Sequence, residues 1–426
     1  MSNYTAPVDG VHMHLENKKV GNYFFWFIWI MYAFVYMTKY CFSSALAPIV
    51  ESGVLTKTET GLIAASFHVV YAPLQIVGGM FADRYNPERM IKIGLLGSAV
   101  ANLIIFFNQN FYVMLFTWMF NAAIQFAIWP SVFKITASQL PRSEKSKNVF
   151  FISFSPTMGL LLSFIVAGIL PAWQLNFAVS SAVSLVLFIL MHFICKKVDR
   201  FMLPDRETLL ENIKERDDKG ISLMTLMISS GLLLIIAVNL IRTMIGQGAQ
   251  TLAPTMLMES YEGISASFGN ILNIIVIISG IFGVFSSRFL IKRKIIKNEI
   301  TGLAGALFII IPMCVIICML GKIPSILVIV SMSVISFCAT AASFLTSSYS
   351  SRFAAFGKDG TVAGMINCSG SAALIVQTYG FSAVADNFGW VAVSKLWVVL
   401  TTVAVIMSIA AIPIFNKFRK KHREVM

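Results

Sequence analysis

Long apolar segments alternate with short polar ones along almost the whole chain. Each apolar segment has about 20 residues, the length that a helix needs to cross ~30 Å of hydrocarbon. The pattern predicts an all-α integral membrane protein with twelve membrane-spanning helices. These are expected at residues 22–46, 60–81, 90–107, 110–133, 148–171, 174–195, 222–257, 263–287, 300–320, 323–348, 360–384 and 389–415.

The longest polar segment between two spans, residues 196–220, divides the twelve spans into six and six. It is expected to be a cytoplasmic loop between an N-terminal six-helix bundle (22–195) and a C-terminal one (221–415). Residues 1–21 and 416–426 are expected to be cytoplasmic tails. The first tail is polar, so no cleavable signal peptide is expected.

The 33 lysines and arginines are distributed unevenly between the two sets of loops. If the N-terminus is cytoplasmic, 28 of them lie in the tails and inner loops, and only Lys57 and Lys322 lie in outer loops. Positive residues are enriched on the cytoplasmic side of membrane proteins. We therefore expect a multi-pass protein of a cell membrane, a bacterial inner or plasma membrane, with both termini in the cytoplasm.

Composition narrows the class of function. The chain is 57% hydrophobic and 12% charged, which excludes a soluble protein, and its net charge of +13 follows from the topology and from attraction to anionic lipid headgroups. Nucleic-acid binding is therefore not expected. The six cysteines lie within spans or at their ends, so neither a disulfide framework nor a metal site is expected. No nucleophile–base arrangement and no phosphate-binding glycine loop is found, so we expect no catalytic residue and no cofactor.

The two halves of the chain look like copies of each other. Lys39 interrupts the first apolar span, and Arg242, 203 residues later, interrupts the seventh. The ends of spans two and eight are also related, with Arg84 and Arg288 separated by 204 residues. Parallel repeats of this kind are typical of the major facilitator fold, in which two pseudo-symmetric six-helix bundles enclose a substrate site near the middle of the membrane.

The loop after span two reads GGMFADRYNPER, residues 78–89. A carboxylate and arginines near helix ends can hold the cytoplasmic ends of helices together in one state of a transport cycle. We expect a conformational latch formed by Gly79, Asp83, Arg84, Arg89 and, in the second copy, Arg288. The second copy has Ser287 where the first has Asp83, which weakens it. The alternative is an ordinary loop with juxtamembrane charges.

Lys39 and Arg242 have no acidic partner at their depth, because all 20 aspartates and glutamates lie in loops or tails. An ionisable residue at the bilayer centre costs ~2.5–3.5 kcal/mol and usually pairs or lines a polar cavity. The missing partner is most simply a bound anion, held by the planar fork of arginine and the point charge of lysine. Two alternatives stay open, a neutral or proton-switching Lys39 and mere structural packing.

Polar residues near the same depth are candidates to complete this site. Their alternative role is hydrogen bonding between helices, which is common in membrane bundles. The candidates are Tyr36 and Ser43 beside Lys39, Asn239 beside Arg242, Asn121 and Gln125 in span four, Asn273 in span eight, and Asn367 in span eleven.

The chain resembles the organophosphate:phosphate antiporter family, which includes bacterial glycerol-3-phosphate and hexose-phosphate transporters. The resemblance lies in TKYCFSSALAPIV of span one, DRYNPERM after span two and LIRTMIGQGAQTLAPTML of span seven, with a weaker match at residues 360–390. It implies that Lys39 and Arg242 bind a substrate phosphate. The family usually has arginine at the position of Lys39, lysine at that of Gln75, and histidine near Ser155 and Pro156.

These features together predict a secondary transporter of a small organic anion, a phosphorylated metabolite exchanged for inorganic phosphate by alternating access. The lack of acidic residues within spans favours exchange over coupling to protons. Two alternatives stay open. One is a transporter of a carboxylate or sugar acid with the same fold, and the other is a non-transporting sensor that signals through a partner kinase. The expected partners are the anion, phosphate and membrane lipids, and the protein is expected to be a monomer.

Overall fold

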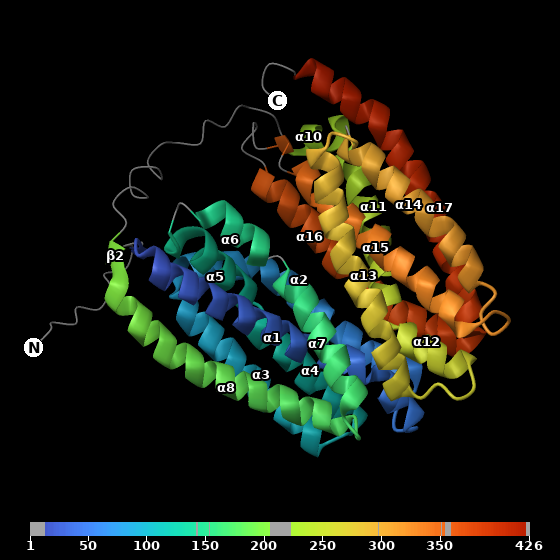
Figure 1. Ribbon diagram of the computed structural model, residues 1–426, viewed down its shortest axis with the longest axis horizontal. Helices are drawn as coiled ribbons and strands as arrows, with labels where there is room; N and C mark the ends of the chain where they lie inside the picture. The colour runs from blue at the N-terminus through green and yellow to red at the C-terminus, as the bar shows by residue number, and fades with distance from the viewer. Residues whose placement is uncertain are drawn as a thin grey trace, which may run out of the picture.

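The computed structural model describes residues 13–141, 144–152, 154–204, 223–296, 298–350, 352–353 and 359–422. In these residues the chain is helical except for one short two-stranded ribbon (Figure 1). The elements before the central loop are β1 (Met13–Leu15), α1 (Lys18–Glu51), α2 (Lys57–Arg84), α3 (Pro87–Phe107), α4 (Phe111–Gln125), α5 (Ile128–Lys134), η1 (Ile135–Gln139), α6 (Lys145–Ile152), α7 (Ser155–Ile169), α8 (Gln174–Val198), η3 (Asp199–Phe201) and β2 (Met202–Pro204).

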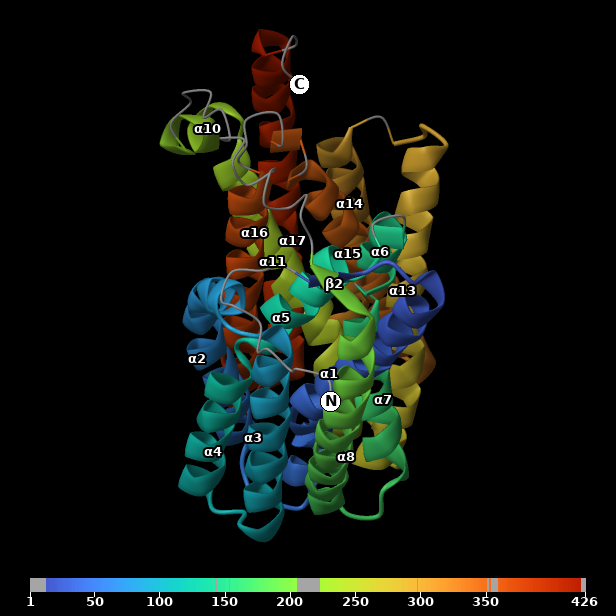
Figure 2. The ribbon, with the colours of Figure 1, turned by 90° about the vertical axis from the view of Figure 1, so that its left-hand side faces the viewer.

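The elements after the central loop form the second bundle. They are α10 (Leu223–Ser229), α11 (Leu232–Thr251), α12 (Ala253–Ser260), α13 (Ala266–Lys292), α14 (Glu299–Ile317), α15 (Ser325–Ser350), α16 (Asp359–Ile375), η5 (Val376–Gly380) and α17 (Phe381–Lys421). Figure 2 shows α10 set beside the ends of α16 and α17, away from the first bundle.

The predicted all-helical membrane architecture is confirmed. Among the described residues, nine continuous helical segments are long and apolar enough to cross a membrane by themselves. One of these, Gly364–Lys421, has 58 residues and holds two predicted spans. They are separated at Gly389, whose φ of 77° interrupts the helical backbone and favours glycine. The second predicted span is α2, and α6 with α7 forms the fifth.

Asparagines mark several helix starts. The side-chain oxygens of Asn17, Asn86 and Asn110 each accept two backbone N–H bonds in the first turn of α1, α3 and α4. Asn298 does the same once at the start of α14. The first N–H groups of a helix have no partner within the helix, and such a cap contributes ~1 kcal/mol. These polar residues therefore place the helix ends at the limits of the apolar segments.

The buried apolar residues form one large cluster mainly in the second bundle and two clusters in the first, and the two bundles meet mainly through α7 and α2 of the first bundle. α7 packs against α13, and α2 packs against α16, η5 and α17. Between the bundles, buried Leu160 and Phe164 of α7 contact Ile277 of α13. In Figure 1 the bundles converge near α7 and α12, and they diverge toward β2, α10 and the end of α17.

Glycines allow two close helix contacts that support this interface. A Cβ atom at Gly159 of α7 would collide with the backbone carbonyl of Ala33 and with Tyr36, both on α1. A Cβ atom at Gly283 of α13 would collide with the backbone carbonyl of Phe337 on α15. Within each bundle, the helix that meets the other bundle is thus packed backbone to backbone against an inner helix.

A short ribbon ties the two ends of the first bundle together. β1 pairs antiparallel with β2, so that His14 lies opposite Leu203. Leu15 is fully buried at the end of β1. The ribbon lies within segments that the sequence pattern assigns to a polar tail and to the central loop, and residues 205–220 of that loop lie outside the described residues.

The convergent face is held by charged contacts between helices of the two bundles. Nζ of Lys57, at the start of α2, is 2.7 Å from a carboxylate oxygen of Glu259 and 3.4 Å from one of Asp386. Trp390 Nε1 also donates to Glu259 at 2.9 Å, and the hydroxyl of Thr58 donates to Asp386. We call these five residues the outer latch. It joins α2 of the first bundle to two helices of the second, α12 and α17.

Candidate functional site

Lys39 lies within α1 among aromatic rings. Its Nζ atom is 3.9 Å from the ring centroid of Tyr71 and 5.1 Å from those of Tyr36 and Phe67. In the described part of the chain, this ammonium group makes neither an ion pair nor a hydrogen bond. A cation over an aromatic face gains ~0.5–2 kcal/mol. These three rings, which we call the aromatic cage, stabilise the charge and leave the N–H groups of Lys39 available.

The cage continues a row of tyrosines on α1. Tyr32, Tyr36 and Tyr40 are four residues apart, so they share one face of the helix, and adjacent ring centroids are 5.1 Å and 5.9 Å apart. Tyr32 also stacks on Trp129 of α5, with centroids 5.3 Å apart. Tyrosine hydroxyls can donate hydrogen bonds to an anion. This helix face therefore offers both apolar surface and donors beside Lys39.

Arg242 lies on α11 and is only 9% exposed. Its Nε and Nη2 donate to Oδ1 of Asn239 at 3.3 Å and 2.7 Å. Nη2 also donates to Oγ1 of Thr243 at 2.8 Å, and Nη1 donates to the backbone carbonyl of Ala339 on α15 at 3.0 Å. None of these acceptors carries a charge. Because a guanidinium has five N–H donors, one donor of Nη1 remains for a ligand in this state.

Asn239 connects Arg242 to a third helix. Its Nδ2 donates to the backbone carbonyl of Ile366 and to Oγ of Ser369, each at 2.9 Å, and both residues lie on α16. Asn239 is buried, with 3% exposure. The guanidinium of Arg242 is therefore held by α11, α15 and α16 together.

The two bundles are joined close to both cations. Oη of Tyr40, the residue after Lys39, donates to Oε1 of Gln247 at 3.4 Å. Gln247 lies on α11, the helix that also carries Arg242. Further toward the outer latch, Nδ2 of Asn270 donates to the backbone carbonyl of Ser44 at 3.0 Å. The helices that carry the two cations, α1 and α11, are thus joined by a polar contact between the bundles.

Asn121 and Gln125 take part in contacts between helices of the first bundle. Nε2 of Gln125 donates to Oδ1 of Asn121 and to Oγ of Ser98 on α3, each at 2.9 Å. Both side chains are almost completely buried. Nδ2 of Asn121 has no hydrogen-bond partner among the described atoms. One buried donor in this pair is therefore open to a ligand or a water molecule.

The other predicted residues lie in different surroundings. Tyr36 belongs to the aromatic cage, and Ser43 is half-buried on α1. Asn273 is fully buried on α13 and donates to the backbone carbonyl of Gln250 at 2.6 Å, which ties α13 to α11. Asn367 is exposed on α16. The structure therefore gathers Tyr36 at Lys39 and Asn239 at Arg242, while Asn273 joins helices.

Three side chains that contact the two cations had not been predicted. Phe67 and Tyr71 lie one turn apart on α2 and complete the aromatic cage, and Thr243 accepts a hydrogen bond from its neighbour Arg242. Aromatic residues four apart on a span are a possible sequence signal, but lipid-facing surfaces carry the same pattern.

The residues of the predicted conformational latch after span two, which we call the inner latch, are only partly described. The side chains of Gly79, Asp83 and Arg84 at the end of α2 lie outside the described residues. Arg89 on α3 and Arg288 on α13 are exposed. The role of this loop therefore stays a prediction.

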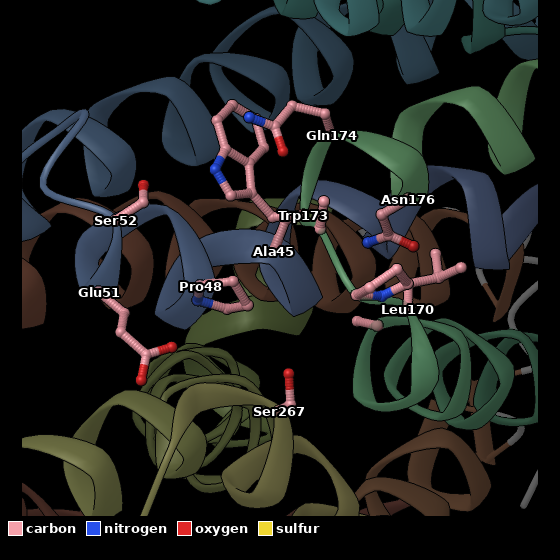
Figure 3. Close-up of a pocket in the computed structure, with 12 residues that line it drawn as sticks. Ala45, Pro48, Glu51, Ser52, Leu170, Trp173, Gln174, Asn176 and Ser267 are labelled. Atoms are coloured by element: carbon pink, nitrogen blue, oxygen red, sulfur yellow. The ribbon is translucent and has the colours of Figure 1, made fainter.

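A pocket of about 340 Å³ lies at the far end of α1 (Figure 3). It is lined by residues of α1, of the segment leading into α8, and of α13, including Glu51, Trp173 and Ser267. Both carboxylate oxygens of Glu51 accept the backbone N–H of Ala266 at 3.3 Å, which adds a second contact between the bundles. Neither Lys39 nor Arg242 lines this pocket, so it is separate from the candidate anion site.

Comparisons with known proteins agree with the architecture. The sequence pattern that defines the Major Facilitator Superfamily matches residues 28–378. Among solved structures, a bacterial homologue of the human lysosomal transporter Spinster superposes with a TM-score of 0.74 at 14% identity, covering 94% of this chain and 98% of that one. A D-xylose–proton symporter gives a TM-score of 0.70 at 14% identity, covering 91% and 97%. These likenesses show the fold.

Closer sequence relatives match over part of their length. The membrane sensor protein UhpC of Salmonella typhimurium is 30% identical over 118 residues, 28% of this chain and 27% of that protein. A probable hexose phosphate transport protein of Chlamydia trachomatis is 26% identical over 123 residues, 28% and 26%. The glycerol-3-phosphate transporter of Bacillus subtilis is 25% identical over 192 residues, 43% of each chain. The matches span between a quarter and under a half of these relatives.

Proposed function

Because the chain belongs to the Major Facilitator Superfamily, we propose that it is a secondary transporter of a small organic anion, a phosphorylated metabolite that it exchanges for inorganic phosphate. The anion binds between the two bundles, with Lys39 on one side and Arg242 on the other. The relatives named for hexose phosphate and glycerol 3-phosphate support this class of substrate.

This proposal rests on the groups that surround the two cations. Arg242 is buried and bonded only to uncharged acceptors, and Lys39 is held only by aromatic rings within the described residues. Two positive charges within membrane spans, with no carboxylate bonded to either in the described part of the chain, favour an anionic ligand. Because one charge comes from each bundle, the same ligand can contact both bundles throughout a transport cycle.

In the topology that we propose from the distribution of positive charges, both termini lie in the cytoplasm. The bundles then diverge toward the cytoplasm, and the outer latch closes the opposite face. In this arrangement the loop at residues 78–89 acts as the inner latch of the outward-open state. Alternation between the two latches moves the anion across the membrane.

Exchange by purified protein in proteoliposomes tests the proposal. Vesicles loaded with inorganic phosphate are expected to take up labelled glycerol 3-phosphate or a hexose phosphate, and empty vesicles are expected to take up much less. Arg242→Gln and Lys39→Gln are each expected to weaken binding ten- to hundredfold, because hydrogen bonds to charged groups contribute ~1.5–3 kcal/mol.

Lys395 provides a matched control. It is also a lysine within a predicted span, but it is exposed near one end of that span. Lys395→Gln is expected to transport like the wild type. If the substrate stabilises the wild type, Arg242→Gln and Lys39→Gln equally on heating, the proposed anion site is wrong.

A carboxylate or sugar acid is the second candidate substrate, and the geometry of Arg242 favours it. Four of its five N–H donors are already used by the protein, which leaves a single hydrogen bond for the ligand in this state. The family's additional lysine and histidine positions hold Gln75 and the Ser155–Pro156 pair. Uptake of a sugar acid, with no stimulation by internal phosphate, would select this candidate.

A sensor without transport activity is a third candidate, favoured by the likeness to UhpC, which is named as a membrane sensor protein. The same vesicles separate these roles. A sensor is expected to be stabilised by its anion on heating and to carry none of it across the membrane.

A further inference from the structure

The side-chain amide of Asn239 has no hydrogen-bonding group left for a ligand. An asparagine amide has two N–H donors and one carbonyl oxygen with two lone pairs. Here Oδ1 accepts from Nε and from Nη2 of Arg242, and the Nδ2 group donates to Ile366 and to Ser369. Every hydrogen-bonding position of the amide is therefore occupied by the protein.

The orientation of this amide is determined by its neighbours. A guanidinium only donates, so the oxygen of Asn239 must face Arg242 and the nitrogen must face α16. On α16, Oγ of Ser369 donates in turn to the backbone carbonyl of Ile366 at 2.7 Å. The hydrogen bonds form a directed chain from the guanidinium through Asn239 to α16, in which each group donates to the next. Such chains polarise each member and strengthen one another.

The same chain fixes the guanidinium plane. Oγ1 of Thr243 donates to the backbone carbonyl of Asn239 at 2.7 Å and accepts from Nη2 of Arg242 at 2.8 Å. Together with the two bonds to Asn239, this holds the Nε and Nη2 edge of Arg242 against its own helix. The N–H of Nη1 that is not bonded to Ala339 is the donor left for a ligand.

We propose that Asn239 is a positioning residue, which with Ser369 orients Arg242 toward the anion and makes that orientation depend on the place of α16. The proposal rests on the proposed function, in which Arg242 binds the anion. It differs from the expectation that Asn239 contacts the substrate, because here Asn239 acts through Arg242. Since α16 packs against α2 of the other bundle, a shift of α16 changes how the arginine presents its remaining N–H.

Two variants test this in the full-length protein, with inorganic phosphate as the probe and thermal shift as the readout. Ser369→Ala removes one acceptor of the Asn239 amide and lies on the far side of it from Arg242, and it is expected to weaken phosphate binding by three- to tenfold. Ser369→Thr keeps the hydroxyl and is expected to restore binding. Asn239→Asp keeps the size of the side chain but places a negative charge beside the guanidinium, and it is expected to weaken phosphate binding ten- to hundredfold, as Arg242→Gln does.

Ser408→Ala is the matched control. Ser408 is a fully buried serine of α17 whose hydroxyl donates to the backbone carbonyl of Ala404, and it has no link to Arg242. It is expected to bind phosphate like the wild type. If Ser369→Ala and Asn239→Asp bind phosphate normally while Arg242→Gln does not, Asn239 is not a positioning residue and the anion site stands.

A measurement without any ligand separates this inference from the proposed function. Phenylglyoxal modifies accessible arginines, and mass spectrometry of the peptide containing Arg242 gives the rate. The rate is expected to rise severalfold in Ser369→Ala, where the guanidinium is less firmly held, and to stay unchanged in Ser408→Ala. Equal rates in all three proteins overturn the inference. Normal phosphate binding by Arg242→Gln, with the expected change in the modification rate, overturns only the proposed function.

Discussion

Nζ of Lys57 lies 2.7 Å from Oε2 of Glu259, and this ion pair joins the first bundle to the second. The same ammonium group is 3.4 Å from Asp386, so one cation binds carboxylates from two helices, α12 and α17. All three side chains are between 16% and 23% exposed. A partly exposed pair of this kind contributes up to ~1 kcal/mol, which is enough to shift a balanced two-state equilibrium severalfold.

Charge reversal at this latch is expected to change the conformational equilibrium. Lys57→Glu places three negative charges together, so it should favour separation of the bundles at this face. Labelling of a cysteine introduced at Thr58 should become severalfold faster. The double variant Lys57→Glu/Glu259→Lys should return the rate toward that of the wild type, and Lys322→Glu, an exposed cation outside the latch, should leave it unchanged. Equal labelling of all variants would contradict the latch.

The two cations should differ in their tolerance of exchange. Lys39→Arg is expected to retain transport, because the aromatic cage can stack on a guanidinium and because the resembling family usually has arginine there. Arg242→Lys is expected to lose most anion binding, because one ammonium group cannot replace donors directed at Asn239, Thr243 and Ala339. Binding constants from thermal shift check both. Normal binding by Arg242→Lys would show that the geometry of the arginine is unimportant.

Cys368 should be the cysteine that reacts with a thiol reagent. Among the described cysteines it is the exposed one, Cys318 is half-buried and the others are buried. Gly364 and Asn367 are exposed on the same face of α16, and a face this polar is expected to meet water between the bundles. A membrane-impermeant maleimide applied from the side of the termini should label the wild type, and Cys368→Ser should remain unlabelled. Failure to label the wild type would place this face against lipid.

A single added methyl group should test the close helix contacts. Gly283→Ala is expected to lower the thermal stability, because its Cβ would collide with the carbonyl of Phe337, and overpacking costs ~1–3 kcal/mol. Gly305→Ala on α14 meets no atom within 4 Å and should be neutral or stabilising. The melting temperatures of the two variants in the same detergent decide this. A similar melting temperature for both would mean that α13 and α15 can separate freely.

The orientation in the membrane can be tested at two positions. A reporter fused after Met426 should be active in the cytoplasm, and a cysteine at Asn110, the exposed residue before α4, should react with impermeant reagents from outside. Reaction of Asn110→Cys only from the cytoplasmic side would reverse the proposed topology.

The spans could be predicted because the bilayer fixes the length of apolar helix that crosses it. Their internal breaks were harder to predict. The span expected at 222–257 is three helices, broken at Gly231, where φ is 77°, and again at Leu252 before Pro254. The segments on both sides of each break are apolar, so the hydrophobic pattern does not reveal where the helix breaks.

The candidate site could be predicted only in part. Lys39 and Arg242 stand out because a charge in an apolar segment is costly wherever the helix packs. The partners of Arg242 depend on which helices lie beside α11. The acceptor on α15 is the backbone carbonyl of Ala339, which has no side chain that could reveal it. The role of Asn239 likewise depends on Ser369 of α16, which is 130 residues away in the sequence.

The aromatic cage gives Lys39 a kind of freedom that Arg242 lacks. Attraction between a cation and the face of a ring changes gradually with position, whereas a hydrogen bond is lost when its angle or length changes. In the proposed site, Lys39 is therefore expected to follow the anion as the bundles tilt, while Arg242 stays in register with its helices. Such a pair of one compliant and one rigid contact accommodates anions of different length, so we expect the carrier to discriminate more sharply at the end of the ligand held by Arg242.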